Sequence, residues 1–166
     1  MGLQTTVNIN PALGVPGSAA SFQGLVSTVK QYQSDGTAKA GSFALPSTNS
    51  VNTGGAAVSA GFVGLTNGSA TAAVGLVVRV VSAATAAGTD ASLVYPAGDA
   101  VTVALRGAYY IAATGSASVG QKVLVTVATG AISFGSSASS GQIDTGWTVQ
   151  TAAASSGDII IIANFG

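Results

Sequence analysis

Along most of this chain, short runs of apolar residues alternate with clusters of Gly, Ser, Asn and Ala. Residues 101–106 and 122–127 are the clearest runs, because a valine or leucine occupies every second position in each. A period of two is typical of strands that bury one face. Glycine and proline stand where the chain must turn between them, at Pro96-Ala97-Gly98, Gly107, Gly115 and Gly130. The pattern predicts an all-β fold, an antiparallel β-barrel or sandwich-like domain.

Two further segments carry strand signals. Asn67-Gly68 lies between two apolar stretches, which is the strongest short-range signal for a β-hairpin, so we expect strands on both sides. The closing segment 141–166 predicts two more strands around an Ala and Ser turn, with Ile159–Ile162 as a buried terminal strand.

Residues 18–33 are ambiguous between helix and strand. Their apolar positions have near-helical spacing, but Gly24 and the β-branched residues weaken a helix, and we favour an extended structure.

Residues 70–87 are the best candidate for a membrane span. Arg79 lies near their centre, where insertion would cost about 2.5 to 3.5 kcal/mol, and the remainder is Ala, Thr and Ser rather than Leu. A strand is the better interpretation, and we expect no membrane association.

The first 22 residues form a separate unit in this interpretation. The stretch "LQTTVNINPALGVPGSAASF" carries no charge, and its two prolines exclude both a helix and a central strand. We predict an extended N-terminal arm over residues 1–22 and a single β domain over residues 23–166. Twenty extended residues reach roughly 65 Å, against a radius of gyration of about 15 Å for the domain, so the arm can leave its own subunit. The start shows no secretory signal.

The arm residues expected to contact another subunit or a shell protein are the apolar ones and the prolines. They are Leu3, Val7, Ile9, Pro11, Leu13, Val15, Pro16 and Phe22.

Charge is scarce. Charged residues make up 6% of the chain, and five positive and five negative side chains cancel. Nothing strong repels one copy from another, which favours assembly, and the balance lacks the basic patch that direct nucleic-acid binding requires.

The residues for catalysis are few. His and Cys are absent, which removes the commonest general base, the thiol nucleophile and the thiolate metal sites. The aspartates are scattered singly, mostly beside turn residues, and no Gly-rich stretch fits a phosphate-binding loop. We therefore expect no enzyme, no cofactor and no metal site.

The aromatic side chains offer a different kind of site, because Tyr and Trp on one face can stack a sugar or mark a protein interface. Tyr109 and Tyr110 are adjacent in a predicted strand and must point to opposite faces. Core packing is the expectation for Trp147.

Five blocks of the chain, taken in order, resemble the structural cement, or capsid decoration, proteins of tailed bacteriophages. The blocks are "MGLQTTVNINPALGVPGSAASF", "AKAGSFAL", "VNTGGAAVSAGFVG", "YPAGDAVTVALRGAYYIAATGSASVGQKVLVTVATGAIS" and "GWTVQTAAASSGDIIIIANFG". Each is built from common turn and strand residues, so their order and spacing carry the resemblance, which covers nearly the whole chain.

The resemblance implies a β-barrel-like subunit, usually a homotrimer, bound to the major capsid protein on the outer capsid surface of the virion at local three-fold positions, without catalysis. Its expected role is to stabilise the shell against the pressure of packed DNA. The alternative from another class is a virion-displayed module that binds host-surface glycans through Tyr and Trp. An enzyme would require two aspartates brought together in a cleft.

Overall fold

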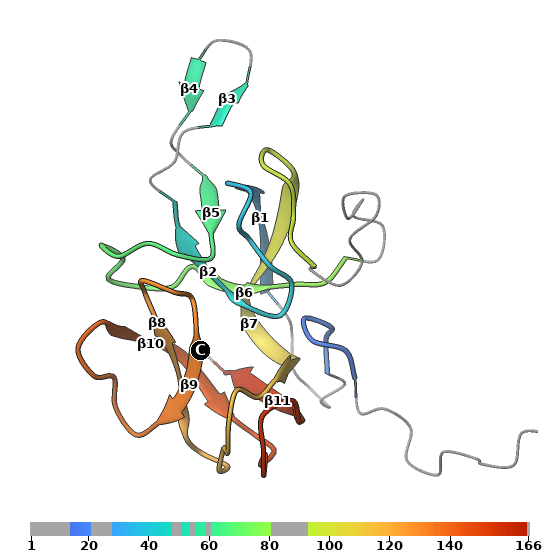
Figure 1. Ribbon diagram of the computed structural model, residues 1–166. Helices are drawn as coiled ribbons and strands as arrows, with labels where there is room; N and C mark the ends of the chain where they lie inside the picture. Colours follow the sequence, from blue (N-terminus) through green and yellow to red (C-terminus); the bar gives the residue numbers. More distant parts are fainter. Residues whose placement is uncertain are drawn as a thin grey trace, which may run out of the picture.

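The computed structural model describes residues 14–20, 28–47, 51–53, 56–58, 61–80 and 93–165. These residues contain eleven strands and no helix (Figure 1). The strands are β1 (Thr28–Ser34), β2 (Phe43–Pro46), β3 (Val51–Thr53), β4 (Ala56–Val58), β5 (Phe62–Gly64), β6 (Gly75–Val77), β7 (Ala100–Ala112), β8 (Lys122–Thr126), β9 (Ile132–Gly135), β10 (Gln142–Val149) and β11 (Ile159–Asn164). The predicted all-β class is confirmed.

A closed barrel forms one half of the fold. Its strand order is β1-β5-β2-β6-β7, and pairing between β1 and β7 closes the ring. The β1–β5 pair is parallel, whereas the other barrel pairs are antiparallel. Strands β3 and β4 pair only with each other in the described part of the chain and lie beyond the end of the barrel (Figure 1).

An antiparallel sheet forms the other half. Its order is β7-β11-β10-β8-β9, so the long strand β7 belongs to both halves. The closing pair predicted over residues 141–166 is confirmed as β10 and β11, which pair through Thr148 and Val149. Figure 1 shows this sheet below the barrel, with β7 running from one to the other.

Two hydrophobic clusters fill the molecule. The smaller lies within the barrel and includes Ala44, Val77 and Val103. The larger joins the barrel to the second sheet and includes Phe43 and Leu76, which precede Ala44 and Val77 in β2 and β6. Because successive side chains of a strand point to opposite faces, β2 and β6 bury both of their faces. Their continuous apolar sequences reflect this double burial.

Strand β7 bends where it passes from one half to the other. Its register with β1 shifts between Thr28 and Val29, the mark of a β-bulge, and Gly107 has a φ of 129°. The sequence-based prediction placed a turn at Gly107, and this is wrong, because the glycine lies inside a 13-residue strand. The positive φ that glycine can adopt allows the strand to kink here without reversing the chain.

The hairpin predicted at Asn67-Gly68 is also corrected. Strands β5 and β6 do lie on either side, but each pairs with β2 and not with the other. A turn closes there, with Ala70 N–H donating to Asn67 O at 2.9 Å. Asn67 also donates from its backbone N–H to Val127 O and from Nδ2 to Pro46 O. These contacts hold the turn against the second sheet and β2. The two flanking strands therefore pair with β2 and do not form a hairpin with each other.

The extended structure favoured for residues 18–33 holds for the described residues, which end in β1. Tyr109 and Tyr110 lie on opposite faces of β7 as predicted: Tyr109 is buried in the larger cluster and Tyr110 is half-buried. Among the described residues, none forms a helix with the length and apolar character needed to cross a membrane.

Candidate functional site

A tight turn at Val15–Ser18 opens the described part of the N-terminal segment. Pro16 and Gly17 occupy its central positions, and Ser18 N–H donates to Val15 O at 2.9 Å. The Ser18 hydroxyl donates to the same oxygen at 2.6 Å, and Val15 N–H lies 3.2 Å from the hydroxyl oxygen. Gly17 has a φ of 83°, as the third position of a Pro-Gly turn requires. The Val-Pro-Gly-Ser sequence therefore specifies this turn locally.

Residues 14–20, which we call the arm root, pair with β7. Gly17 N–H donates to Tyr110 O at 2.8 Å, Tyr110 N–H donates to Ser18 O at 3.0 Å, and Ala20 N–H donates to Ala108 O at 2.8 Å. Strand β1, next along the chain, pairs with the preceding part of β7, from Arg106 to Ala100. The arm root thus continues along β7 the antiparallel pairing that β1 makes.

The arm root also contacts the barrel. Gly17 O accepts a hydrogen bond of 2.9 Å from Arg79 N–H, just after β6. A Cβ on Gly17 would lie 2.9 Å from Gly41 N and 3.0 Å from Arg79 N, which leaves no room for a side chain. The ring of Tyr110 packs directly on Gly14. Backbone contacts from three segments therefore fix the place where the arm meets the domain.

This fixation predicts the effect of Gly17→Val. The variant places a side chain at a positive φ and against two backbone nitrogens, so we expect the arm root to detach while the barrel stays folded. Amide hydrogen exchange at Tyr110 and Ala20 should then accelerate at least tenfold. Ala19→Val is the matched control, because Ala19 is exposed and free of this conflict. Unchanged protection of Tyr110 in Gly17→Val would contradict the account.

A groove of about 390 Å³ begins at the arm root. Pro16 lines it together with the turn between β8 and β9 and the end of β7. The remaining wall comes from residues 39–42 together with Leu65 and Leu93. The lining is largely apolar, with Lys39 as its charged residue.

Of the arm residues predicted to make contacts, the structure describes Val15 and Pro16. Val15 is 43% exposed, and Pro16 lines the groove. Leu3, Val7, Ile9, Pro11, Leu13 and Phe22 lie outside the described residues, and their contacts stay a prediction. The arm residues predicted from the sequence did not include Gly14, Ser18 or Tyr110. The contacts of Gly14 and Ser18 with Tyr110 join segments distant in sequence, whereas the bonds between Ser18 and Val15 are local.

Three of the described aspartates, Asp35, Asp144 and Asp158, accept hydrogen bonds in turns and at a bulge. Asp35 accepts hydrogen bonds from Thr37 and Ser47, and Asp158 accepts the backbone N–H groups of Ala154 and Ser155. Among the described residues, no group of three or more acidic side chains is placed to hold a metal ion. Every buried polar side-chain atom there has a hydrogen-bond partner.

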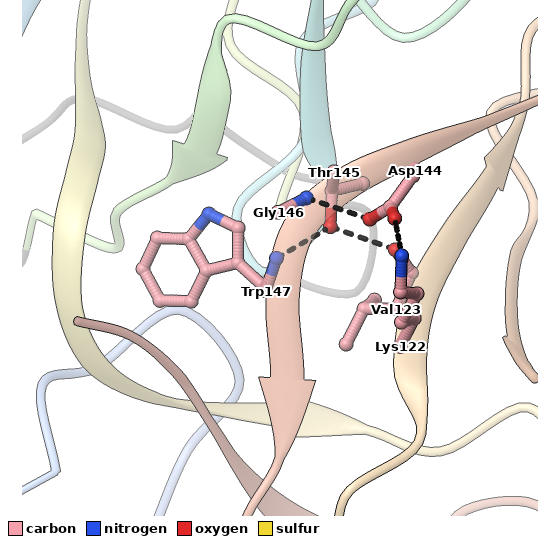
Figure 2. A network of polar contacts seen from close by, with 6 residues as sticks. All are labelled: Lys122, Val123, Asp144, Thr145, Gly146 and Trp147. Atoms are coloured by element: carbon pink, nitrogen blue, oxygen red, sulfur yellow. Dashed lines mark hydrogen bonds and ion pairs between the residues drawn. The ribbon is translucent and has the colours of Figure 1, made fainter. Parts of the chain in front are cut away.

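Figure 2 shows a third polar cluster, around Asp144, where β10 departs from its register with β8. Asp144 pairs with Lys122 Nζ at 2.6 Å and accepts the N–H of Gly146 at 2.9 Å. Thr145 donates to Val123 O at 2.7 Å. The bulge held by these bonds turns the next side chain, Trp147, into the core.

The same cluster sets a pH dependence. Partial burial raises the pKa of Asp144, but the hydrogen bonds from Lys122 and Gly146 and the charge of Lys122 together bring it below its ordinary value. A folded-state pKa below the unfolded value of about 3.9 stabilises the fold above that pH, and this stability is lost as the pH falls through the folded-state pKa.

We therefore expect Asp144→Asn to be less stable than wild type by at most about 1 kcal/mol at pH 7, since the pair is on the surface. The difference should shrink at pH 3, because this pH lies below the unfolded-state pKa of about 3.9 and part of the stabilisation by the carboxylate is already lost there. Urea midpoints at the two pH values measure it. An equal difference at both would show that the ion pair is not its source.

Most of the Tyr and Trp side chains are buried and cannot stack on a glycan. Tyr95, Tyr109 and Trp147 are buried, and Tyr32 and Tyr110 are half-buried on different elements. Since these are all the Tyr and Trp residues of the chain, no exposed stacking platform of Tyr and Trp exists on one face.

The fold defines an all-β barrel protein in which residues 14–20 pair with a bent strand, β7. A capsid structure shares this fold: a chain of the Myoviridae phage XM1 capsid superposes with a TM-score of 0.64 at 13% identity, covering 99% of each chain. No curated protein sequence matches.

The sequence profile of one family, described as structural cement protein (E217 gp24/Pam3 gp6), matches residues 3–164. The chain belongs to the structural cement protein family, and its place is in the virion, on the phage capsid. The family resemblance recognised in the sequence is confirmed.

Proposed function

We propose that this protein decorates the outer surface of a tailed-phage head as a homotrimer at local three-fold positions, bound to the major capsid protein. The observation that carries the proposal is the family match, which begins at residue 3 and so includes the arm as well as the barrel. The role is structural and involves no catalysis.

The arm is the proposed clamp. Its root is fixed to β7 and the barrel, so a pull on residues 1–13 is transmitted to both halves of the fold. Those residues are uncharged and carry Leu3, Val7, Ile9 and Leu13. Against a neighbouring subunit or the shell, these side chains become buried while the backbone extends a sheet. Val15, exposed beside the anchored turn, belongs to the same contact surface.

Each bound copy contributes binding free energy to the shell, and these contributions add up over many copies. At roughly 25 cal/mol per Å², an arm that buries about 800 Å² of apolar surface gains about 20 kcal/mol gross, and the ordering of the arm consumes much of this. The net gain per copy is modest. Repeated at every decorated position, it raises the force needed for packed DNA to rupture the head.

The proposal is tested in two steps. Light scattering gives the mass of the purified protein, which should be that of a trimer. The protein is then mixed with undecorated heads and sedimented, and we expect it to co-sediment with them until sites are saturated. A monomer that stays in the supernatant would refute the proposed function.

A further inference from the structure

One edge of β1 is only partly paired. Its other edge pairs with β7 along the whole strand, from Thr28 to Gln33. Strand β5 reaches the remaining edge only at Gln33 and Ser34. Residues 28–32 therefore present a strand edge that no described residue covers.

The open hydrogen-bonding groups can be assigned to particular residues. Ser34 N–H donates to Asp99 O at the β7 side, whereas Gln33 N–H donates to Gly61 O at the β5 side. Because alternate residues of a strand bond to opposite sides, Gln31 and Val29 point their N–H and C=O groups away from β7. The Val29 side chain is 47% exposed and the Gln31 side chain donates to Thr102 Oγ1 at 2.8 Å.

Such an edge is a template for another strand. Two cationic side chains lie at this strand, Lys30 within it and Arg106 opposite Thr28 in the register. The Val29 side chain, next to the open edge, is 47% exposed. Among the described residues, none pairs with this part of the edge, so it can accept a strand from outside them.

The chain itself contains a segment of the required pattern. In residues 3–9, Leu3, Val7 and Ile9 fall in one row with Thr5, and Gln4, Thr6 and Asn8 fall in the other. This alternation, without charge and without proline until Pro11, is that of a strand with one buried face. Seven residues in extended form span about 23 Å, enough to cover the open edge.

We propose that residues 3–9 of a second copy add as a strand to the open edge of β1, so that the arms link neighbouring subunits of the assembly. This inference rests on the proposed function and names the acceptor of the arm. Thirteen residues precede the arm root, and fully extended they reach about 45 Å, which suffices to cross to an adjacent barrel.

Photo-crosslinking tests the proposal without assuming a register. Benzoylphenylalanine replaces Gln31 in one protein sample, which is mixed with an isotopically labelled sample that carries the natural Gln31, and irradiated after assembly. We expect crosslinks to peptides from residues 1–13 of the labelled copy. The same group in place of Val119, which is 62% exposed, is the control and should give none. Crosslinks confined to the same copy, or to capsid protein alone, would overturn the proposal.

A proline at the same position tests the hydrogen bonds. Gln31→Pro removes an N–H that does not bond to β7, so the barrel should keep its thermal stability within a few degrees. Gln31→Ala loses the same bond to Thr102 but keeps the N–H, and is the matched control. We expect the trimer of Gln31→Pro to dissociate at least tenfold more readily than that of Gln31→Ala.

The two hypotheses fail in different ways. Equal behaviour of the proline and alanine variants, with head binding intact, would refute the strand addition and leave the proposed function standing. Crosslinked subunits that do not bind heads would refute the proposed function and leave the strand addition standing.

Discussion

Removal of residues 1–13 should abolish decoration of heads and leave the domain folded. The truncation spares the arm root, whose bonds to Tyr110, Ala108 and Arg79 stay in place. It removes the apolar side chains that we propose to bury against a neighbour. A loss of several kcal/mol per copy corresponds to more than a hundredfold weaker binding. The measurement is the fraction of protein that co-sediments with undecorated heads over a range of concentrations.

A second truncation separates the arm from its root. Removal of residues 1–20 also deletes the pairing with β7, so we expect a lower thermal midpoint in addition to lost binding. The shorter truncation should keep the midpoint of the full chain. Full head occupancy by the protein that lacks residues 1–13 would show that the barrel surface alone binds the capsid.

Trp147→Ala should have the largest effect on stability, about 3 to 5 kcal/mol. The indole is 1% exposed, and its ring lies 6.1 Å from that of Phe43 and 5.9 Å from that of Tyr109, both edge-on. Phe43 belongs to β2 and Tyr109 to β7, so the truncation leaves a cavity where the barrel meets the second sheet. Such a loss is a large share of the roughly 5 to 15 kcal/mol that stabilises a typical domain.

Urea unfolding followed by circular dichroism measures this change as a lower midpoint with an unaltered slope. Trp147→Phe should recover more than half of the loss, because it keeps a buried ring. Phe165→Ala, at a side chain that is 61% exposed, should stay within about 0.5 kcal/mol of the wild type. A Trp147→Ala midpoint equal to that of Phe165→Ala would contradict the assigned core.

Local patterns predicted the strands whose sequence carries a simple period. The alternation at residues 101–106 and 122–127 appears in β7 and β8, and the isoleucine run forms β11. The Val-Pro-Gly-Ser turn is likewise determined by four consecutive residues. In each case the physical cause acts over a few positions, so the sequence displays it directly.

Pairing between distant segments was not predictable in this way. Asn67-Gly68 turns the chain, yet its flanking strands pair with β2, because contacts to Pro46 and Val127 hold the turn elsewhere. Gly107 resembles a turn residue but bends a continuous strand that serves both halves. The open edge of β1 depends on how far β5 extends, which no local pattern encodes.

Imaging of heads reconstituted with the purified protein tests decoration at the local three-fold positions. We expect added density for three copies of the barrel around each of these positions on the outer surface, with arm density joining each barrel to a neighbour. Heads that lack added density after saturation, or that carry single isolated barrels elsewhere on the shell, would contradict it.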